Sequence, residues 1–381
     1  MKTTILLLTF VITATLLNAQ IYSGKIGKYP VYLELEPASE NGELYGRYFY
    51  NSSCVDLPIE GKKTGGKLTL YAGSFFKEQD QKEKFNLTLK GNSLNGTWTY
   101  NGKSLKVSLK ATNEKTVSNS FKTNPFVKEN NFFTGYENIR SSMASFMALD
   151  SFVNLKNGIQ LQWYKEKHWN SYLFRVSKGL PDATMKWANQ YLESEQLGDF
   201  CDRGSCGSGE YNEFSSDVTD YFVNADFLSA NILTSYYCGG AHPDFGSRKP
   251  ILDLKNLREL NTEDILQFEG VTDRNTGTEY NENWLTYRDE NYAQSVLKMM
   301  KAAYPDEFTT SENEEDCNYD DPSVWSLSDV MITEDGLLFG AYFYRAARMC
   351  DDPEWAILSY SELSEYLNPA YKAALLNIEK Q

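Results

Sequence analysis

Residues 20–112 alternate apolar and polar side chains with a period of two, and this pattern constrains the fold more than any other feature of the chain. Phe85, Leu87 and Leu89 alternate with polar residues, and 105–110 repeats the pattern. Gly and Asn-Gly sequences such as TGGK and YNGK separate the runs, and they accept the positive φ of tight hairpins. We therefore expect an N-terminal antiparallel all-β meander that closes, or nearly closes, into a barrel.

Aromatic residues in this β region have two interpretations. A row of rings on one face would form a stacking surface for a glycan. Aromatic residues in strands are more commonly core residues or cross-strand pairs, and the core interpretation is favoured. The residues concerned are Tyr45, Tyr48, Phe49, Tyr50, Trp98 and Tyr100.

Residues 113–150 are polar and weakly patterned, so we place a linker region there between two domains. Helical and strand periods are interspersed over 151–381 without a strict βαβ order. This mixture predicts a C-terminal α+β domain, with an antiparallel sheet and helices on one face. Helices are expected over 180–197 and 285–303, and strands over 227–237, 330–344 and 354–360.

The first 19 residues have the features of a secretory signal peptide. Lys2 precedes an apolar run over 5–17, and the small residue Ala19 follows it. We expect cleavage near Ala19 and a periplasmic or secreted protein. No later segment is long and apolar enough for a membrane span.

Export makes the six cysteines candidates for disulfides, because oxidising compartments preserve these bonds. Cys201 and Cys206 enclose the short stretch CDRGSC, and Cys317 and Cys350 lie at the two ends of an expected hairpin region. Local pairing therefore predicts a bridge within each of these pairs. Pairing of the remaining two cysteines is the weakest part of this prediction; they are Cys54 and Cys238.

The formal net charge of the chain is −15. Such an acidic surface repels nucleic acid and anionic membranes, and it attracts basic proteins or cations. Simple solubility is the plainer explanation of the same charge. We expect no nucleic acid among the partners.

The stretch SYYCGGAHPDFG, residues 235–246, brings reactive residue types together. A Cys-His nucleophile pair needs a thiolate, and Cys238 is expected to be oxidised outside the cell. A zinc site needs three or four ligands, and the chain has only two histidines, His168 and His242. We expect no metal and no cofactor, and we interpret the stretch as a structural corner that can also bind a ligand. Its candidate binding residues are Tyr237, Gly239, Gly240, His242 and Asp244.

An acidic run, ENEEDCNYDD, surrounds Cys317. Such a run is usually a solvated loop, but a disulfide could hold it as a fixed acidic patch for a cation or a basic protein. The candidate residues are Glu312, Glu314, Glu315 and Asp316.

Residues from about 150 to 370 resemble a bacterial extracytoplasmic domain of unassigned chemistry, with the segment 237–242, Asp253 and Leu260 as the most specific part. That domain occurs in the lysozyme-sensing anti-sigma factor of Gram-positive bacteria and beside the catalytic domain of a secreted peptidoglycan deacetylase. This sequence adds cysteines and contains neither the transmembrane helix of the first nor the catalytic domain of the second. The resemblance implies binding of a lysozyme-type muramidase or of peptidoglycan.

These observations predict an exported cell-envelope binding protein and favour a role without catalysis. The main alternative is an envelope enzyme, or an accessory subunit, that acts on peptidoglycan or another glycan. It would use carboxylates, because glycoside hydrolysis needs a carboxylate pair about 5 to 10 Å apart and no histidine. A purely structural envelope protein is the third interpretation.

Overall fold

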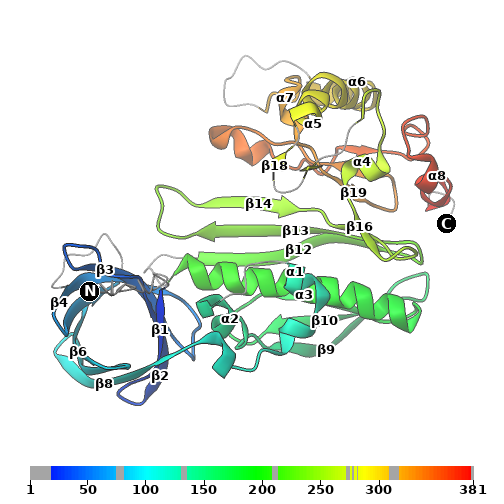
Figure 1. Ribbon diagram of the computed structural model, residues 1–381. Coiled ribbons are helices and arrows are strands. Elements are labelled where there is room, and N and C mark those ends of the chain that lie inside the picture. The colour runs from blue at the N-terminus through cyan, green and yellow to red at the C-terminus, as the bar shows by residue number, and fades with distance from the viewer. Residues whose placement is uncertain are drawn as a thin grey trace, which may run out of the picture. The chain divides into compact units, whose positions relative to one another are not determined.

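The computed structural model describes most of the chain, apart from the N-terminal segment and short stretches elsewhere (Figure 1). The expected signal peptide and the four acidic residues from Glu312 to Asp316 lie outside the described residues, except for Ala19. The prediction of one all-β and one α+β domain is confirmed. The described residues are 19–73, 81–129, 135–207, 213–271, 275–276, 279–280, 282–308 and 317–378.

The chain divides into two compact units, which we name the barrel unit and the sheet unit. The barrel unit comprises residues 1–123, 127–143 and 201–212, and the sheet unit comprises 124–126, 144–200 and 213–381.

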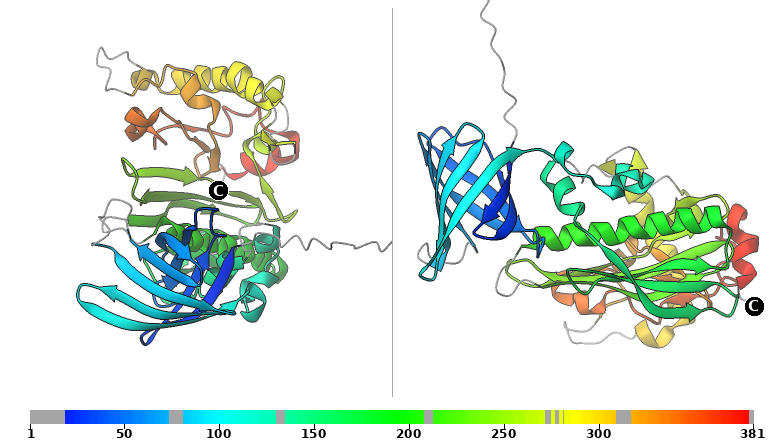
Figure 2. Two further views of the ribbon diagram at one scale, coloured as in Figure 1. Left: turned by 60° about the vertical axis from the view of Figure 1, so that its left-hand side comes forward. Right: turned by 90° about the horizontal axis from the view of Figure 1, so that it is seen from below.

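Eight antiparallel strands form a closed barrel in the barrel unit (Figure 2). Each strand pairs with the next in sequence, and β1 pairs with β8 to close the ring. Alternate residues such as Leu70 and Leu94 point inward and form an apolar core. The strands are β1 (Gln20–Ile26), β2 (Tyr29–Leu35), β3 (Glu43–Tyr50), β4 (Leu57–Thr64), β5 (Lys67–Ala72), β6 (Glu83–Lys90), β7 (Ser93–Tyr100) and β8 (Lys103–Thr112).

Glycines allow the barrel strands to approach one another closely. A Cβ atom on Gly96 would lie 1.9 Å from the carbonyl oxygen of Asn86, and one on Gly61 would lie 2.1 Å from that of Thr69. Because no side chain fits there, glycine permits the tight coiling that closes a small barrel.

The aromatic residues of the barrel have different surroundings. Tyr48 and Trp98 belong to the barrel core, whereas Phe49 is buried on the outer face against α2. Tyr45 is 50% exposed. The core interpretation therefore holds for the buried rings and is wrong for Tyr45, which points outward.

Short helices follow β8 within the stretch expected to be a linker. In the barrel unit, α2 (Gly135–Ser141) packs its Tyr136 and Ile139 against Phe49. Arg140, fully buried, lies 2.8 Å from the carboxylate of Asp56 and anchors α2 to the barrel. The other elements here are η2 (Glu114–Thr116), η3 (Ser120–Thr123) and α1 (Pro125–Glu129).

The sheet unit is built around a long helix and antiparallel strands. The helix α3 (Asp182–Cys206), of which residues 201–206 are counted in the barrel unit, packs Ala188 and Leu192 against Leu228 and Ile232 of the sheet. The strands run in the orders β11-β10-β9 and β12-β13-β15-β16, with β14 also paired to β13. They are β9 (Phe146–Asn154), β10 (Gln160–Glu166), β11 (Tyr172–Lys178), β12 (Glu213–Val223), β13 (Phe227–Tyr237), β14 (Asp244–Arg248), β15 (Ile251–Asp253) and β16 (Arg258–Leu260).

The C-terminal part of the chain forms a second apolar core. The strand β13 contributes residues both to this core and to the core under α3. Leu228 packs with α3, and its neighbour Phe227 joins this second core, because successive strand residues point to opposite faces. We name residues 262–378 the C-terminal layer. Its elements are α4 (Thr262–Ile265), β17 (Asn275–Thr276), β18 (Glu279–Tyr280), α5 (Glu282–Tyr287), the π-helix η4 (Arg288–Tyr292), α6 (Ala293–Ala303), η5 (Pro305–Phe308), α7 (Ser323–Ser326), β19 (Val330–Ile332), β20 (Leu337–Phe339), η6 (Arg345–Cys350), β21 (Ile357–Leu358) and α8 (Pro369–Leu376).

Candidate functional site

The stretch 235–246 forms the exposed turn between β13 and β14. Gly239 has a φ of 89°, which glycine adopts without strain. The hydroxyl of Tyr237 donates to the carbonyl oxygen of Gly240 at 2.9 Å and fixes the turn. The described geometry agrees with a structural corner.

The histidine and aspartate of this turn have different roles. His242 is exposed. Asp244 forms an ion pair with Arg348 of η6, which also pairs with Asp351 at 3.0 Å. Asp244 therefore holds β14 against the C-terminal layer, and no described contact assigns it to a ligand. The other histidine, His168, contacts buried Glu166 at 2.9 Å.

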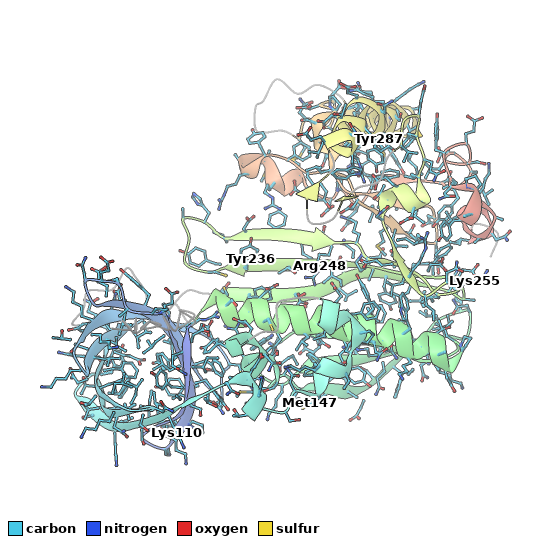
Figure 3. The ribbon with its side chains drawn as sticks, in the orientation of Figure 1. Lys110, Met147, Tyr236, Arg248, Lys255 and Tyr287 are labelled. Atoms are coloured by element: carbon cyan, nitrogen blue, oxygen red, sulfur yellow. A yellow bond between two sulfur atoms is a disulfide. The ribbon has the colours of Figure 1, made fainter. Side chains whose placement is uncertain are left out.

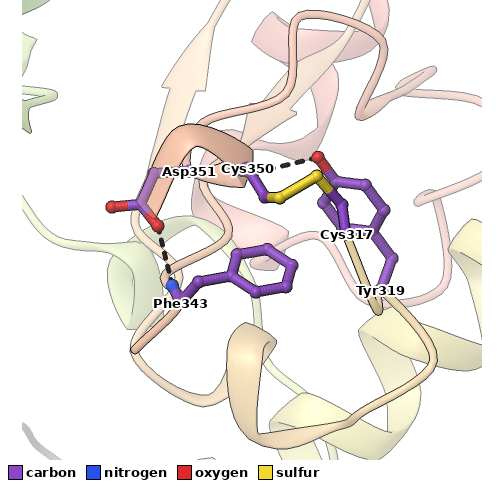
Figure 4. The surroundings of a disulfide bond; sticks show 5 residues. All are labelled: Cys317, Tyr319, Phe343, Cys350 and Asp351. Carbon is purple, nitrogen blue, oxygen red and sulfur yellow. Dashed lines mark hydrogen bonds between the residues drawn. A yellow bond between two sulfur atoms is a disulfide. The ribbon is translucent and has the colours of Figure 1, made fainter. Parts of the chain in front are cut away.

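One of the two expected local disulfides is present. Cys317 and Cys350 are bonded, and the hydroxyl of Tyr319 donates to the carbonyl oxygen of Cys350 at 2.9 Å (Figure 4). The bridge closes a loop with a sequence separation of 33 residues. This prediction is confirmed.

The expected Cys201–Cys206 bridge is wrong. Cys201 is a buried thiol, whereas Cys206 and Cys238 are each disulfide-bonded. Both Cys201 and Cys206 lie on α3, where residues five apart point in different directions and have Cα atoms about 8 to 9 Å apart, too far for a disulfide. Cys54 is also a thiol, so the suggested Cys54–Cys238 bridge is wrong too. Burial raises the pKa of Cys201, which makes it a poor nucleophile.

A cleft of about 730 Å³ within the sheet unit is a further candidate site. It is lined by α3, by β14 and the segment that leads into β15, by β16, and by Thr262, Asp329 and Val330 of the C-terminal layer. We name it the acidic cleft. Its polar residues are Tyr191, Glu195, Ser247, Arg248, Lys249, Glu259, Asn261, Thr262 and Asp329.

Both cations of the acidic cleft are paired with carboxylates. Arg248, labelled in Figure 3, lies 2.9 Å from Asp199 and 3.4 Å from Glu195. Lys249, whose side chain is fully buried, lies 2.5 Å from Asp352. The lining contains three carboxylates and these two cations, so the cleft has a negative surplus by count.

Tyr191 lies between two carboxylates of the acidic cleft. Its hydroxyl donates to Glu259 at 2.7 Å. Burial raises the pKa of Tyr191, and the charges of Glu195 and Glu259 raise it further. Tyr191 therefore stays a neutral hydrogen-bond donor.

Lys249 also contacts a serine that lines the cleft. Its Nζ atom lies 3.0 Å from Oγ of Ser247 and 3.4 Å from the hydroxyl of Tyr342. A Cβ atom on Gly340 would lie within 3.1 Å of the side-chain ends of Lys249, Tyr342 and Asp352, so a larger residue there would displace this cluster. A serine nucleophile needs a base that accepts its proton, whereas Nζ of Lys249 donates to Ser247. The cluster therefore has the geometry of an ion pair with hydrogen-bonded neighbours.

The described residues were searched for groups that could bind a metal ion and for helices that could span a membrane. Among the residues that the structure describes, no three His, Cys, Asp or Glu side chains are grouped to hold a metal ion. Within the same residues, no helix combines the length and apolarity that a membrane crossing needs.

The similarities found among known proteins are to solved structures. No protein-family profile matches the chain, and neither does any curated protein. A crystal structure of a DUF3298 family member from Bacteroides fragilis is similar over 62% of this chain and 97% of that chain, with 12% identity and a TM-score of 0.34. The specific relation to the lysozyme-sensing factor and to the deacetylase stays a prediction.

Sequence reasoning missed the acidic cleft. Glu195, Glu259 and Asp329 come from three distant segments and form no local motif. The one available signal was Leu260, which the resemblance singled out and which lines the same cleft.

Proposed function

We propose that this chain is an exported cell-envelope binding protein whose acidic cleft takes basic side chains of a protein partner. A lysozyme-type muramidase is the partner class that the sequence resemblance suggests. Peptidoglycan is the second ligand to test.

The observation that carries the proposal is the charge balance of the cleft. Three carboxylates line it, Glu195, Glu259 and Asp329, against the two cations Arg248 and Lys249, and each cation is already paired with an aspartate. A lysine or arginine from a partner would meet carboxylates that accept charge-assisted hydrogen bonds. A volume of about 730 Å³ suits a few inserted side chains, which is how anchor residues act at protein interfaces.

The enzyme alternative is less well supported. A glycosidase acid needs apolar surroundings that keep it protonated. Glu259 is exposed, and Glu195 lies 3.4 Å from Arg248. The Ser247–Lys249 contact likewise does not present a base to the serine, because Lys249 donates to Ser247 and pairs with Asp352. These surroundings favour binding over catalysis.

Surface plasmon resonance on the chain from Gln20 tests the proposal. Lysozyme and cytochrome c, both basic, serve as analytes at low and physiological salt, with soluble peptidoglycan as a competitor. We expect lysozyme binding to persist at physiological salt, where attraction between exposed charges is screened beyond about 8 Å. The double variant Glu259→Gln/Asp329→Asn should weaken it about tenfold or more, because the inserted cation loses its charged acceptors.

The matched control is Glu354→Gln/Glu365→Gln, which removes the same charge at two exposed positions outside the cleft. It should change affinity less than about twofold, as expected for screened surface charges. Equal, salt-abolished binding of both analytes would overturn the proposal. So would equal losses in the two double variants.

A further inference from the structure

The outer face of the barrel has a groove of about 450 Å³ over β3, β4 and β5. It lies in the barrel unit and is independent of the acidic cleft. We name it the tyrosine groove. Its lining residues are Glu43, Tyr45, Glu60, Gly61, Lys62, Thr69 and Tyr71.

Two tyrosines point outward from the same level of the barrel. Tyr45 is opposite Glu60 on β4, and Glu60 is opposite Tyr71 on β5. The neighbours Leu44, Leu70 and Ala72 are buried in the barrel core, so the alternation directs Tyr45 and Tyr71 to the outside. Two strand spacings separate the rings by about 10 Å.

Polar side chains lie beside this aromatic pair. Glu43 is opposite Lys62, and Lys62 is opposite Thr69, so these three form a second row across the same strands. In the first row, Lys82 fixes the carboxylate of Glu60 at 2.7 Å. Hydrogen-bonding groups therefore lie both between and beside the two rings.

We propose that the tyrosine groove binds a linear glycan of neutral or N-acetylated pyranoses. Pyranose rings present flat faces of C–H groups, which pack on Tyr45 and Tyr71. Their equatorial hydroxyls reach Glu43, Glu60, Lys62 and Thr69, which supply both donors and acceptors. A separation of about 10 Å lets one chain contact both aromatic rings at once.

The lining disfavours a peptide as the ligand. No aliphatic side chain lines the groove, whereas peptide-binding grooves depend on dry apolar pockets. Each of β3, β4 and β5 is paired on both sides, so none of them has a free edge for an added strand. The lining carboxylates disfavour a strongly anionic chain as well.

Isothermal titration of the chain from Gln20 with chitohexaose, cellohexaose and maltohexaose tests the proposal. We expect at least one of these to bind. Tyr45→Ala and Tyr71→Ala should each raise Kd about three- to tenfold, the size expected when one aromatic contact is lost. The double variant should bind no measurable sugar.

Tyr29→Ala is the matched control, because Tyr29 is 47% exposed on the same barrel and does not line the groove. It should leave Kd unchanged, and circular dichroism should show that all variants keep the wild-type fold. The proposal is overturned if no oligosaccharide binds, if the double variant retains affinity, or if a proline-rich peptide binds in place of the sugars. Lysozyme binding should be unaffected by the two tyrosine variants, so this result is distinguishable from failure of the acidic cleft.

Discussion

The barrel and the C-terminal layer of the sheet unit bury similar apolar side chains, but different contacts hold them together. Barrel core residues come from alternate positions of strands that are mostly neighbours in sequence. In the C-terminal layer, a buried ion pair joins separate segments: Arg288 of η4 lies 2.6 Å from Glu263 of α4. Arg288 also donates to the carbonyl oxygen of Ser328 at 2.6 Å. The barrel thus depends on a repeated local pattern, and the C-terminal layer on a few long-range polar contacts.

Arg288→Met should give the largest effect and tests this difference directly. Removal of the guanidinium leaves Glu263 buried without its cation, which costs about 3–5 kcal/mol. Hydrogen exchange measured by mass spectrometry should show peptides of the C-terminal layer exchanging about 100-fold faster or more. Barrel peptides should keep their protection.

The second variant Arg288→Met/Glu263→Gln sharpens this test, because it removes both charges. It should recover a large part of the lost protection, since no unpaired carboxylate remains. Equal loss of protection in barrel peptides, or no recovery in the double variant, would contradict the comparison.

Gly96→Ala should have an intermediate effect, confined to the barrel. The new methyl group would meet the backbone oxygen of Asn86, so strands must shift, at a cost of about 1–3 kcal/mol. Gly198→Ala is the control, because Gly198 lies on α3 with no atom within 4 Å of the added Cβ. It should stabilise α3 by about 0.5–1 kcal/mol. Urea denaturation followed by peptide-resolved hydrogen exchange measures both, and a neutral Gly96→Ala would show that the barrel tolerates a wider strand spacing.

The smallest effect concerns pH and Asp253, at the end of β15. Burial raises the pKa of Asp253, but hydrogen bonds from Asn256, Tyr371 and Lys255 outweigh it and hold the pKa below its ordinary value of 3.8. A lowered pKa stabilises the folded state above about pH 4, and this contribution is lost as the pH falls through the folded-state value. The stability difference between wild type and Asp253→Asn should therefore be constant from neutral pH to about pH 4 and shrink below it. Urea denaturation across this range checks the trend, and a constant difference at the lowest pH would contradict it.

The local elements were predictable because each has a short-range signal. Strand alternation and Gly turns predicted the barrel, and the run 227–237 coincides with β13. The expected helix over 285–303 corresponds to α5, η4 and α6 and ends before Pro305. The expected strand over 330–344 is instead two short strands, β19 and β20, and Gly336, with a φ of 153°, lies in the turn between them.

The predictions that are wrong or missing depend on contacts between residues that are far apart in the sequence. Gly198 resembles a helix end, yet α3 continues to Cys206, and this continuation is what invalidates the local disulfide. Arg248 and Lys249 likewise pair with residues that are far away in the sequence, Asp199 and Asp352 respectively. Only the folded chain shows which carboxylates and cations meet in the acidic cleft.

Closure of the barrel has a consequence for the time course of folding. Seven of the eight strand pairings join consecutive strands, whereas β1 must wait for β8, and Ile21 finally pairs with Thr112. Pairing β1 with β8 closes a loop of most of the barrel sequence, and this costs more chain entropy than closing any of the hairpins between consecutive strands. While the chain emerges, β1 and the newest strand both keep open hydrogen-bonding sides that another nascent copy can occupy. When β8 pairs with β1, neither strand keeps an open side, and the barrel can no longer pair with another copy.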